Sequence, residues 1–132
     1  MEETMKYLAT IILSLFALTA CGEHTFKGNT YTLTTSPENM PITISFDPAE
    51  NKYYGKALNN YFGNYVQNKN DITFTPVGTT MMMGSPTDMQ AETNYLEELQ
   101  QVVRFKVADK YLVLILKNNK ELLFQKTGVF EK

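Results

Sequence analysis

Residues 85–126 read SPTDMQAETNYLEELQQVVRFKVADKYLVLILKNNKELLFQK, and this stretch decides the fold. It opens with helix signals: Ser85 is a good N-cap, Pro86 suits the first helical position, and Asp88 completes a capping box. We expect the helix to end near Val102. Apolar residues recur at helical spacing and should face the core: Met89, Leu96, Leu99 and Val103. Polar residues expected to face water are Glu92, Glu97, Glu98 and Gln100.

After the helix, the period of the apolar pattern changes to two. Apolar and charged residues alternate over 103–107, which predicts a strand. Residues 111–116 are apolar on both faces, so we expect a central strand beneath the helix. Asn118 and Asn119 predict a tight hairpin turn, because asparagine tolerates positive φ, and 121–126 is the returning strand.

Toward the N-terminus the chain carries strand patterns without a second helix. Short segments rich in Tyr, Phe, Ile and Thr occupy 30–34, 42–46, 53–57, 61–67 and 72–75. Gly55 and Gly63 lie inside two of them, as a sharply bent sheet requires. The predicted class is therefore mainly β (α+β), a strongly curled antiparallel sheet or partial barrel with one amphipathic helix packed on it.

The N-terminus predicts export and a lipid anchor. Lys6 precedes an apolar run over 8–18, and LTAC follows at 18–21, the layout of a bacterial lipoprotein signal. We expect cleavage before Cys21, lipid on its thiol, a signal peptide over 1–20, a tether over 21–27 and a domain over 28–128. The alternative is a buried free cysteine after an ordinary hydrophobic helix. Met5 is an alternative start, because Glu2 and Glu3 are unusual in a signal peptide.

A lipid on Cys21 would place the protein on a membrane of the cell envelope. Two or more acyl chains hold a protein there stably, so the domain itself need not touch lipid. Gly22 follows the cysteine where enteric lipoproteins kept at the inner membrane carry Asp. In a Gram-negative host this predicts the outer membrane, with the domain facing the periplasm.

Two spaced blocks of the chain form a recognisable pattern: residues 55–65 read GKALNNYFGNY, and residues 79–83 read TTMMM. They resemble the G-x-G-C-N-x-F-x-G-x-Y signature and the T-T-x-M block of the META/HslJ domain family. Glu92 and Leu96 fall where its helix carries E-x-x-[FY]-L. Many relatives carry cysteine where Leu58 and Gly84 stand. If those cysteines pair in relatives, this chain has lost the bond as a unit, and no redox role is expected.

This resemblance implies a β-rich domain with one helix and no defined biochemical activity. Bacterial members are often envelope lipoproteins linked to heat shock and to novobiocin resistance. The fold is said to look like a secretin-pilot lipoprotein that holds lipid tails in a cracked barrel.

Composition and chemistry argue against several classes of protein. The 132 residues suit one domain, and the formal charge of −2 gives no basic face for nucleic acid. His24 is the single histidine and lies in the tether, so neither a zinc site nor a catalytic triad has a ligand or base in the domain. Glu97 and Glu98 are adjacent and should splay into solvent. We expect no enzyme, cofactor or metal, and a monomer.

The consecutive methionines 81–83 admit two interpretations. Thioethers bind Cu(I), but consecutive strand residues point to opposite faces and would not converge. Core packing is the favoured expectation, since methionine fills irregular gaps.

A group of polar and aromatic residues is the candidate ligand or partner surface. Its members are Asn59, Asn60, Tyr61, Tyr65, Thr79, Thr80, Met82 and Glu92. The alternative is that these side chains satisfy the backbone of bulged strands. We also expect Glu92 to accept hydrogen bonds from the hydroxyls of Thr79 and Thr80, which would clamp helix to loop.

The sequence thus predicts a non-catalytic envelope lipoprotein that binds a partner protein and contributes to stress tolerance or antibiotic resistance. The runner-up is a carrier that holds an acyl chain or other apolar ligand between sheet and helix. A carrier needs an apolar cavity of ~300 Å³ or more, whereas a partner-binding module needs an exposed patch.

Overall fold

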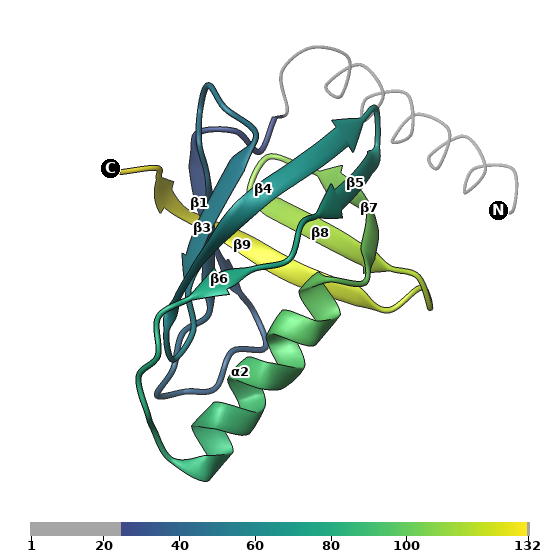
Figure 1. The fold of residues 1–132 in the computed structure, drawn as a ribbon. Helices are drawn as coiled ribbons and strands as arrows, with labels where there is room; N and C mark the ends of the chain where they lie inside the picture. The colour runs from purple at the N-terminus through teal and green to yellow at the C-terminus, as the bar shows by residue number, and fades with distance from the viewer. Residues whose placement is uncertain (1–24, 132) are drawn as a thin grey trace, which may run out of the picture.

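The computed structural model describes residues 25–131 (Figure 1). The predicted signal peptide, Cys21 and His24 lie outside the described residues. The elements are β1 (Asn29–Leu33), β2 (Thr43–Phe46), β3 (Lys52–Lys56), β4 (Asn60–Asn68), β5 (Asp71–Phe74), β6 (Gly78–Thr79), α2 (Pro86–Leu99), β7 (Val102–Val107), β8 (Tyr111–Leu116) and β9 (Glu121–Val129).

Eight of these strands close into an antiparallel barrel. The order is β3-β2-β1-β9-β8-β7-β5-β4, and β4 pairs back onto β3. The short β6 attaches to β4 outside this ring. The predicted mainly-β fold with one helix is confirmed, and the sheet closes fully. The register of β5 with β7 consists of one pair, Asp71 with Arg104, and the Gln100 amide bridges the seam by donating to the Thr75 carbonyl at 3.1 Å.

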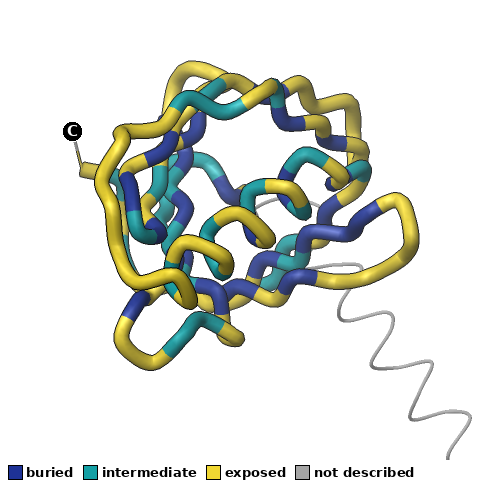
Figure 2. Tube along the Cα trace, turned by 60° about the horizontal axis from the view of Figure 1, so that its bottom comes forward, coloured by how far each residue is buried: buried dark blue, intermediate teal, exposed yellow. Residues whose placement is uncertain are grey.

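Antiparallel pairing gives the barrel two distinct ends. The "tether end" holds the segment 25–28 and the turns 47–51, 69–70 and 108–110. The "helix end" holds the connections 34–42, 57–59, 75–101 and 117–120, including α2. Figure 2 looks onto the helix end and shows α2 crossing the ring of strands. The predicted turn at Asn119 is confirmed by its φ of 69°.

The helix begins as predicted but ends earlier. The Ser85 hydroxyl accepts from the Asp88 backbone N–H at 3.1 Å. The last helical residue is Leu99, because Val102 already pairs with Leu116 in the sheet. Within residues 25–131 no helix is both long and apolar enough to cross a membrane.

The inward face of α2 was predicted correctly at Leu99 and wrongly at Met89 and Val103. Tyr95 and Leu99 are its buried residues, whereas Met89 is 38% exposed and Leu96 only half-buried. Val103 belongs to β7 and not to the helix. The buried stripe runs through positions 92, 95 and 99, so it includes an acidic residue that a hydrophobicity pattern assigns to solvent.

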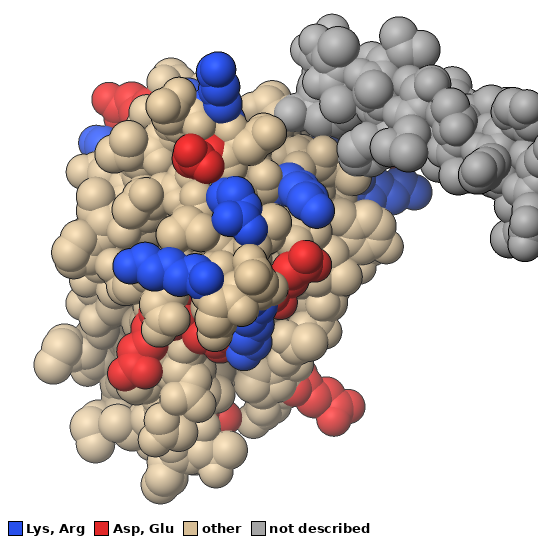
Figure 3. All heavy atoms as spheres, turned by 90° about the vertical axis from the view of Figure 1, so that its right-hand side faces the viewer, with Lys and Arg blue, Asp and Glu red and all other residues tan. Residues whose placement is uncertain are grey.

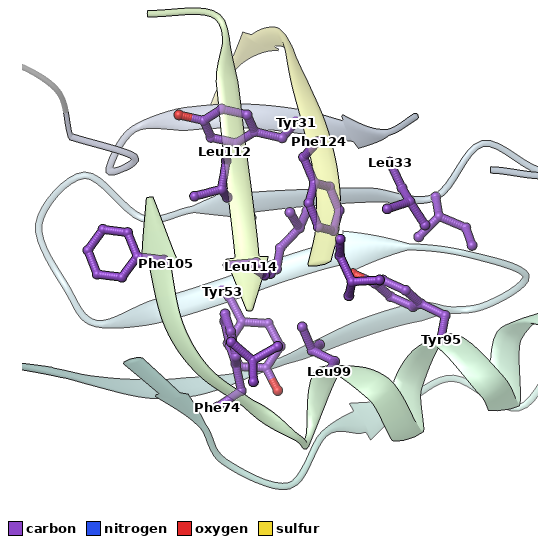
Figure 4. Packing of buried hydrophobic residues seen from close by; sticks show 14 of the residues in the cluster. Tyr31, Leu33, Tyr53, Phe74, Tyr95, Leu99, Phe105, Leu112, Leu114 and Phe124 are labelled. Atoms are coloured by element: carbon purple, nitrogen blue, oxygen red, sulfur yellow. The ribbon is translucent and has the colours of Figure 1, made fainter. Parts of the chain in front are cut away.

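Aromatic side chains fill the barrel interior. Phe26 packs against Phe46 and Phe105, with ring centroids 4.5 and 5.0 Å apart, and Tyr53 meets Phe74 at 5.0 Å. Figure 4 shows Tyr95 and Leu99 directed from the helix into this cluster. The Phe26–Phe105 and Tyr53–Phe74 pairs are edge-to-face and the Phe26–Phe46 pair is tilted, so the helix covers an aromatic core with rings in contact.

Candidate functional site

Asn59, in the turn between β3 and β4, is the centre of a hydrogen-bond network at the helix end. The residue is buried, with 5% of its surface exposed. The amide nitrogen donates to Glu92 Oε1 at 3.0 Å and to the Met82 carbonyl at 3.3 Å. The amide oxygen accepts from the Thr80 hydroxyl at 3.0 Å and from the Met82 N–H. One buried side chain therefore joins the turn, the helix and the loop after β6.

Glu92 points inward, so the prediction that it faces water was wrong. Its Oε2 accepts from the Asn59 backbone N–H at 2.5 Å and its Oε1 accepts from the Asn59 amide nitrogen, so these bonds go to Asn59 and not to the hydroxyls of Thr79 and Thr80. Helix and loop are clamped as expected, but through the Asn59 amide instead of directly. The physical reason is that a half-buried carboxylate needs hydrogen-bond donors, and the turn offers two from one residue.

The three consecutive methionines lie on a surface loop, and the prediction of core packing was wrong. Met81 is 92% exposed, Met82 57% and Met83 84%. Residues 80–85, called here the methionine loop, form neither strand nor helix. Both backbone polar groups of Met82 bind the Asn59 side chain, which fixes the loop along the outside of the barrel.

Asn60 and Thr80 extend the attachment of this loop. The Asn60 N–H donates to the Thr80 hydroxyl at 3.1 Å, and the Thr80 N–H donates to the Asn60 carbonyl at 3.0 Å. Thr79 pairs with Tyr61 across β6 and β4. These polar residues therefore form hydrogen bonds with backbone groups of irregular segments, as the alternative interpretation holds. The same hydrogen bonds also set the position of the exposed methionines.

The two candidate tyrosines belong to the core. The Tyr61 hydroxyl donates to the Thr43 carbonyl and shares a 2.6 Å hydrogen bond with Tyr95. Burial raises the pKa of Tyr61 well above its usual value, and the neighbouring Tyr95 adds to the effect. Burial also raises the pKa of Tyr65 to about 12, with a smaller contribution from Asp47. Tyr65 lies among core rings, away from the methionine loop.

An open cleft of about 410 Å³ adjoins the methionine loop. Its apolar lining comes from Met40, Pro41, Ala57, Leu58 and Met82, and its polar lining from Asn39, Thr43, Lys56 and Asp88. Neither Met40 nor Leu58 was predicted from the sequence to belong to the site. No local signal could have found them, because they come from the connections on either side of β2 and β3.

Leu58 and Gly84 face each other across the base of the methionine loop. A Cβ atom added at Gly84 would lie 2.8 Å from Leu58 Cδ1. The structure thus brings together the two positions at which the sequence resemblance places cysteines in relatives. Here a leucine side chain against a glycine replaces any covalent link.

Across positions 25–131 there is no group of three His, Cys, Asp or Glu side chains placed to hold a metal ion. The arrangement consists of a fixed apolar loop, an open cleft and a few charges, which suits binding.

Comparisons with known proteins agree with this fold. A sequence model described as the META domain matches residues 16–128. A search of curated proteins gives no match. A solution NMR structure of a protein from Burkholderia xenovorans is similar, with a TM-score of 0.67 and 21% identity over 77% of this chain and 83% of that chain. A DUF4847 family protein from Bacteroides vulgatus has a TM-score of 0.59 and 11% identity over 80% of this chain and 96% of that chain.

Proposed function

Because this chain belongs to the META domain family, we propose that it is a non-catalytic binding protein of the bacterial cell envelope, anchored by lipid on Cys21. In this proposal the methionine loop contacts a partner protein, and the complex contributes to envelope stress tolerance or antibiotic resistance. The anchor is supported by the LTAC box at 18–21 and the apolar run before it.

The observation that carries the binding role is the exposure of Met81, Met82 and Met83 on a loop held by Asn59. Exposed apolar side chains lose contact with water when a partner covers them, at about 25 cal/mol per Å² of apolar surface. The flexible thioether side chain adapts to different apolar partners. A preorganised backbone also lowers the ordering cost of binding.

The absence of catalysis is proposed on chemical grounds. The single histidine and the single cysteine of the chain are His24 and Cys21, both before the domain. Nucleophilic catalysis by a hydroxyl usually needs a neighbouring base poised near neutral pH. Both carboxylate oxygens of Glu92 accept hydrogen bonds from Asn59, so in this proposal Glu92 holds the methionine loop in place through Asn59.

The packed interior weighs against the acyl carrier. The space between sheet and helix is occupied by Tyr61, Tyr95 and Leu99, each nearly inaccessible to solvent. An acyl chain at that place would have to displace them and break the hydrogen bond between the two tyrosine hydroxyls. Native mass spectrometry of the protein from its host would reveal a retained lipid, a bound partner or neither.

The proposed anchor would present the methionine loop away from the membrane. Four residue steps separate Cys21 from Thr25 and span at most about 14 Å. Phe26 is buried among rings at the tether end, so the bilayer would lie beside that end. The helix end would then face the aqueous compartment.

Cys21→Ser tests the anchor separately from the binding role. We expect the variant to carry no acyl mass and to remain an uncleaved, mislocalised precursor. Globomycin should likewise cause accumulation of precursor in wild-type cells. An unchanged mature mass with and without globomycin would contradict the anchor.

A complementation experiment tests the function. The host gene is deleted and replaced by the wild type or by a Met81→Gln/Met82→Gln/Met83→Gln variant, and survival is scored after heat and after novobiocin. We expect the variant to fail like the deletion at unchanged protein level. The control is Val66→Gln, at an apolar side chain that is 66% exposed on β4. Equal survival of the loop variant and the control would refute the binding role of the loop.

A further inference from the structure

The charges of the described domain are unequally divided between the two ends of the barrel. The helix end, counted together with the strand residues that directly border its connections, carries six acidic residues and three basic ones, a net charge of −3: Glu38, Asp88, Glu92, Glu97, Glu98 and Glu121 against Lys56, Lys117 and Lys120. The remaining residues of 25–131 carry seven basic and five acidic residues, a net charge of +2. On the face shown in Figure 3, acidic side chains lie at all heights, whereas Lys and Arg lie over the upper and middle parts and are absent from the lowest part. The methionine loop therefore sits at the acidic end of the molecule.

The same end combines this charge with apolar surface. The cleft of about 410 Å³ has an apolar wall that includes Met40, Leu58 and Met82, and its volume lies in the usual range for binding clefts. Asp88 is the one acidic residue among those that line the cleft, and the exposed Glu38 precedes the lining residue Asn39 in the chain. Lys56 is the one basic residue among those that line the cleft.

On the basis of the proposed binding role, we infer that this cleft takes a cationic amphipathic helix of the partner. The apolar face of that helix would lie on Met82 and Leu58, and its Lys or Arg side chains would approach Asp88 and Glu38. Complementary charge steers association and excludes anionic competitors, while the apolar contacts supply most of the affinity.

A helix suits this surface better than an added strand. The strands that border this cleft, β2 and β3, are each paired on both sides, so no free strand edge adjoins it. The methionine loop is held to Asn59 through its own backbone groups at Met82, which leaves its side chains outward. A groove with flexible thioethers is the surface that an amphipathic helix uses elsewhere.

Peptide binding tests the inference directly. The protein is purified from its host in non-ionic detergent and titrated with a fluorescent model peptide of Leu and Lys in helical pattern. A matched peptide carries Glu at every Lys. We expect the Lys peptide alone to bind, and its binding to weaken as salt increases.

Charge and loop variants locate the contact. Asp88→Asn should raise the Kd about 2- to 5-fold, as expected for one exposed charge pair. Lys56→Gln should lower the Kd by a similar factor, and Met82→Gln should raise it about 10-fold. Lys110→Gln and Val66→Gln, at the tether end and on β4, are the controls and should change nothing.

The outcomes separate this inference from the proposed function. Equal or tighter binding of the Glu peptide, or no effect of Asp88→Asn and Lys56→Gln, would overturn the cationic helix. If neither peptide binds although the loop variant fails in complementation, the inference falls and the binding role stands. If the Lys peptide binds as expected although the loop variant complements fully, the inference stands and the proposed role in stress tolerance falls.

Discussion

Replacing the hydrogen-bond donor of the Asn59 side chain by an acceptor should destabilise the domain, and replacing its acceptor on Glu92 by a donor should restore the stability. Asn59→Asp replaces the amide nitrogen that donates to Glu92 and to the Met82 carbonyl by an acceptor oxygen. In the double variant Asn59→Asp/Glu92→Gln, the introduced amide on the helix can donate to the introduced carboxylate in the turn. The pair then exchanges its donor and acceptor with little change in shape.

The contacts set the expected magnitudes. Loss of a hydrogen bond to a charged group costs about 1.5–3 kcal/mol, and two carboxylates brought into contact add roughly 1–2 kcal/mol. We therefore expect Asn59→Asp to lose about 3–5 kcal/mol at neutral pH. The deficit should shrink as pH falls, because protonation of one carboxyl restores a donor. In the double variant we expect a coupling energy of about 2 kcal/mol in favour of folding.

Urea unfolding of the two single variants and the double variant measures these values, with an unchanged m-value as the check on two-state behaviour. Asn60→Asp is the control, because Asn60 is exposed and binds Thr80 through its backbone N–H and carbonyl. That control should change stability by less than about 0.5 kcal/mol. An Asn59→Asp effect no larger than the control, or strict additivity in the double variant, would refute the clamp.

Three further perturbations probe the core and the loop. Leu99→Ala should cost about 2–5 kcal/mol in urea melts and Glu97→Ala less than about 0.5 kcal/mol, and equal costs would mean that the helix faces the other way. Leu58→Cys/Gly84→Cys should form a disulfide that closes a loop of about 26 residues, and reductant should lower its stability by about 3 kcal/mol; thiols that stay free under oxidising conditions would contradict the observed approach of the two positions. Burial raises the pKa of Tyr53 and of Tyr65 to about 12, so their contribution to stability should be full below pH 10 and should be lost as pH rises from 10 toward 12. Their ionisation, followed by ultraviolet absorbance, should accompany unfolding. Ionisation well before unfolding would contradict this prediction.

Local sequence patterns predicted most of the fold. The alternation over 42–46 gives a strand with Ile44 and Phe46 buried, and the capping box at Ser85 starts the helix. The tolerance of asparagine for positive φ was also sufficient to predict the turn at Asn119. Barrel closure could not be derived, because the β3–β4 and β5–β7 pairings complete a ring whose stagger depends on all eight strands.

The errors arose where tertiary hydrogen bonds override hydrophobicity. Glu92 lies on the buried stripe because Asn59 supplies its donors, and this moves the inward face of α2 from Met89 toward Tyr95. Met82 is outside the core because its backbone is bound to the same amide. The resemblance to the META domain family predicted that residues 55–65, residues 79–83 and Glu92 lie close together. The prediction that the methionines are buried rested on residue type alone.

The most direct measurement of the central claim is photo-crosslinking in living host cells. A photoreactive phenylalanine analogue is introduced at Met82 or at Val66, both exposed apolar positions, in the otherwise native protein. The binding role predicts one discrete protein adduct from position 82, absent from position 66 and identified by mass spectrometry as an envelope protein. No adduct from position 82, or the same adducts from both positions, would contradict the claim that the methionine loop binds a partner.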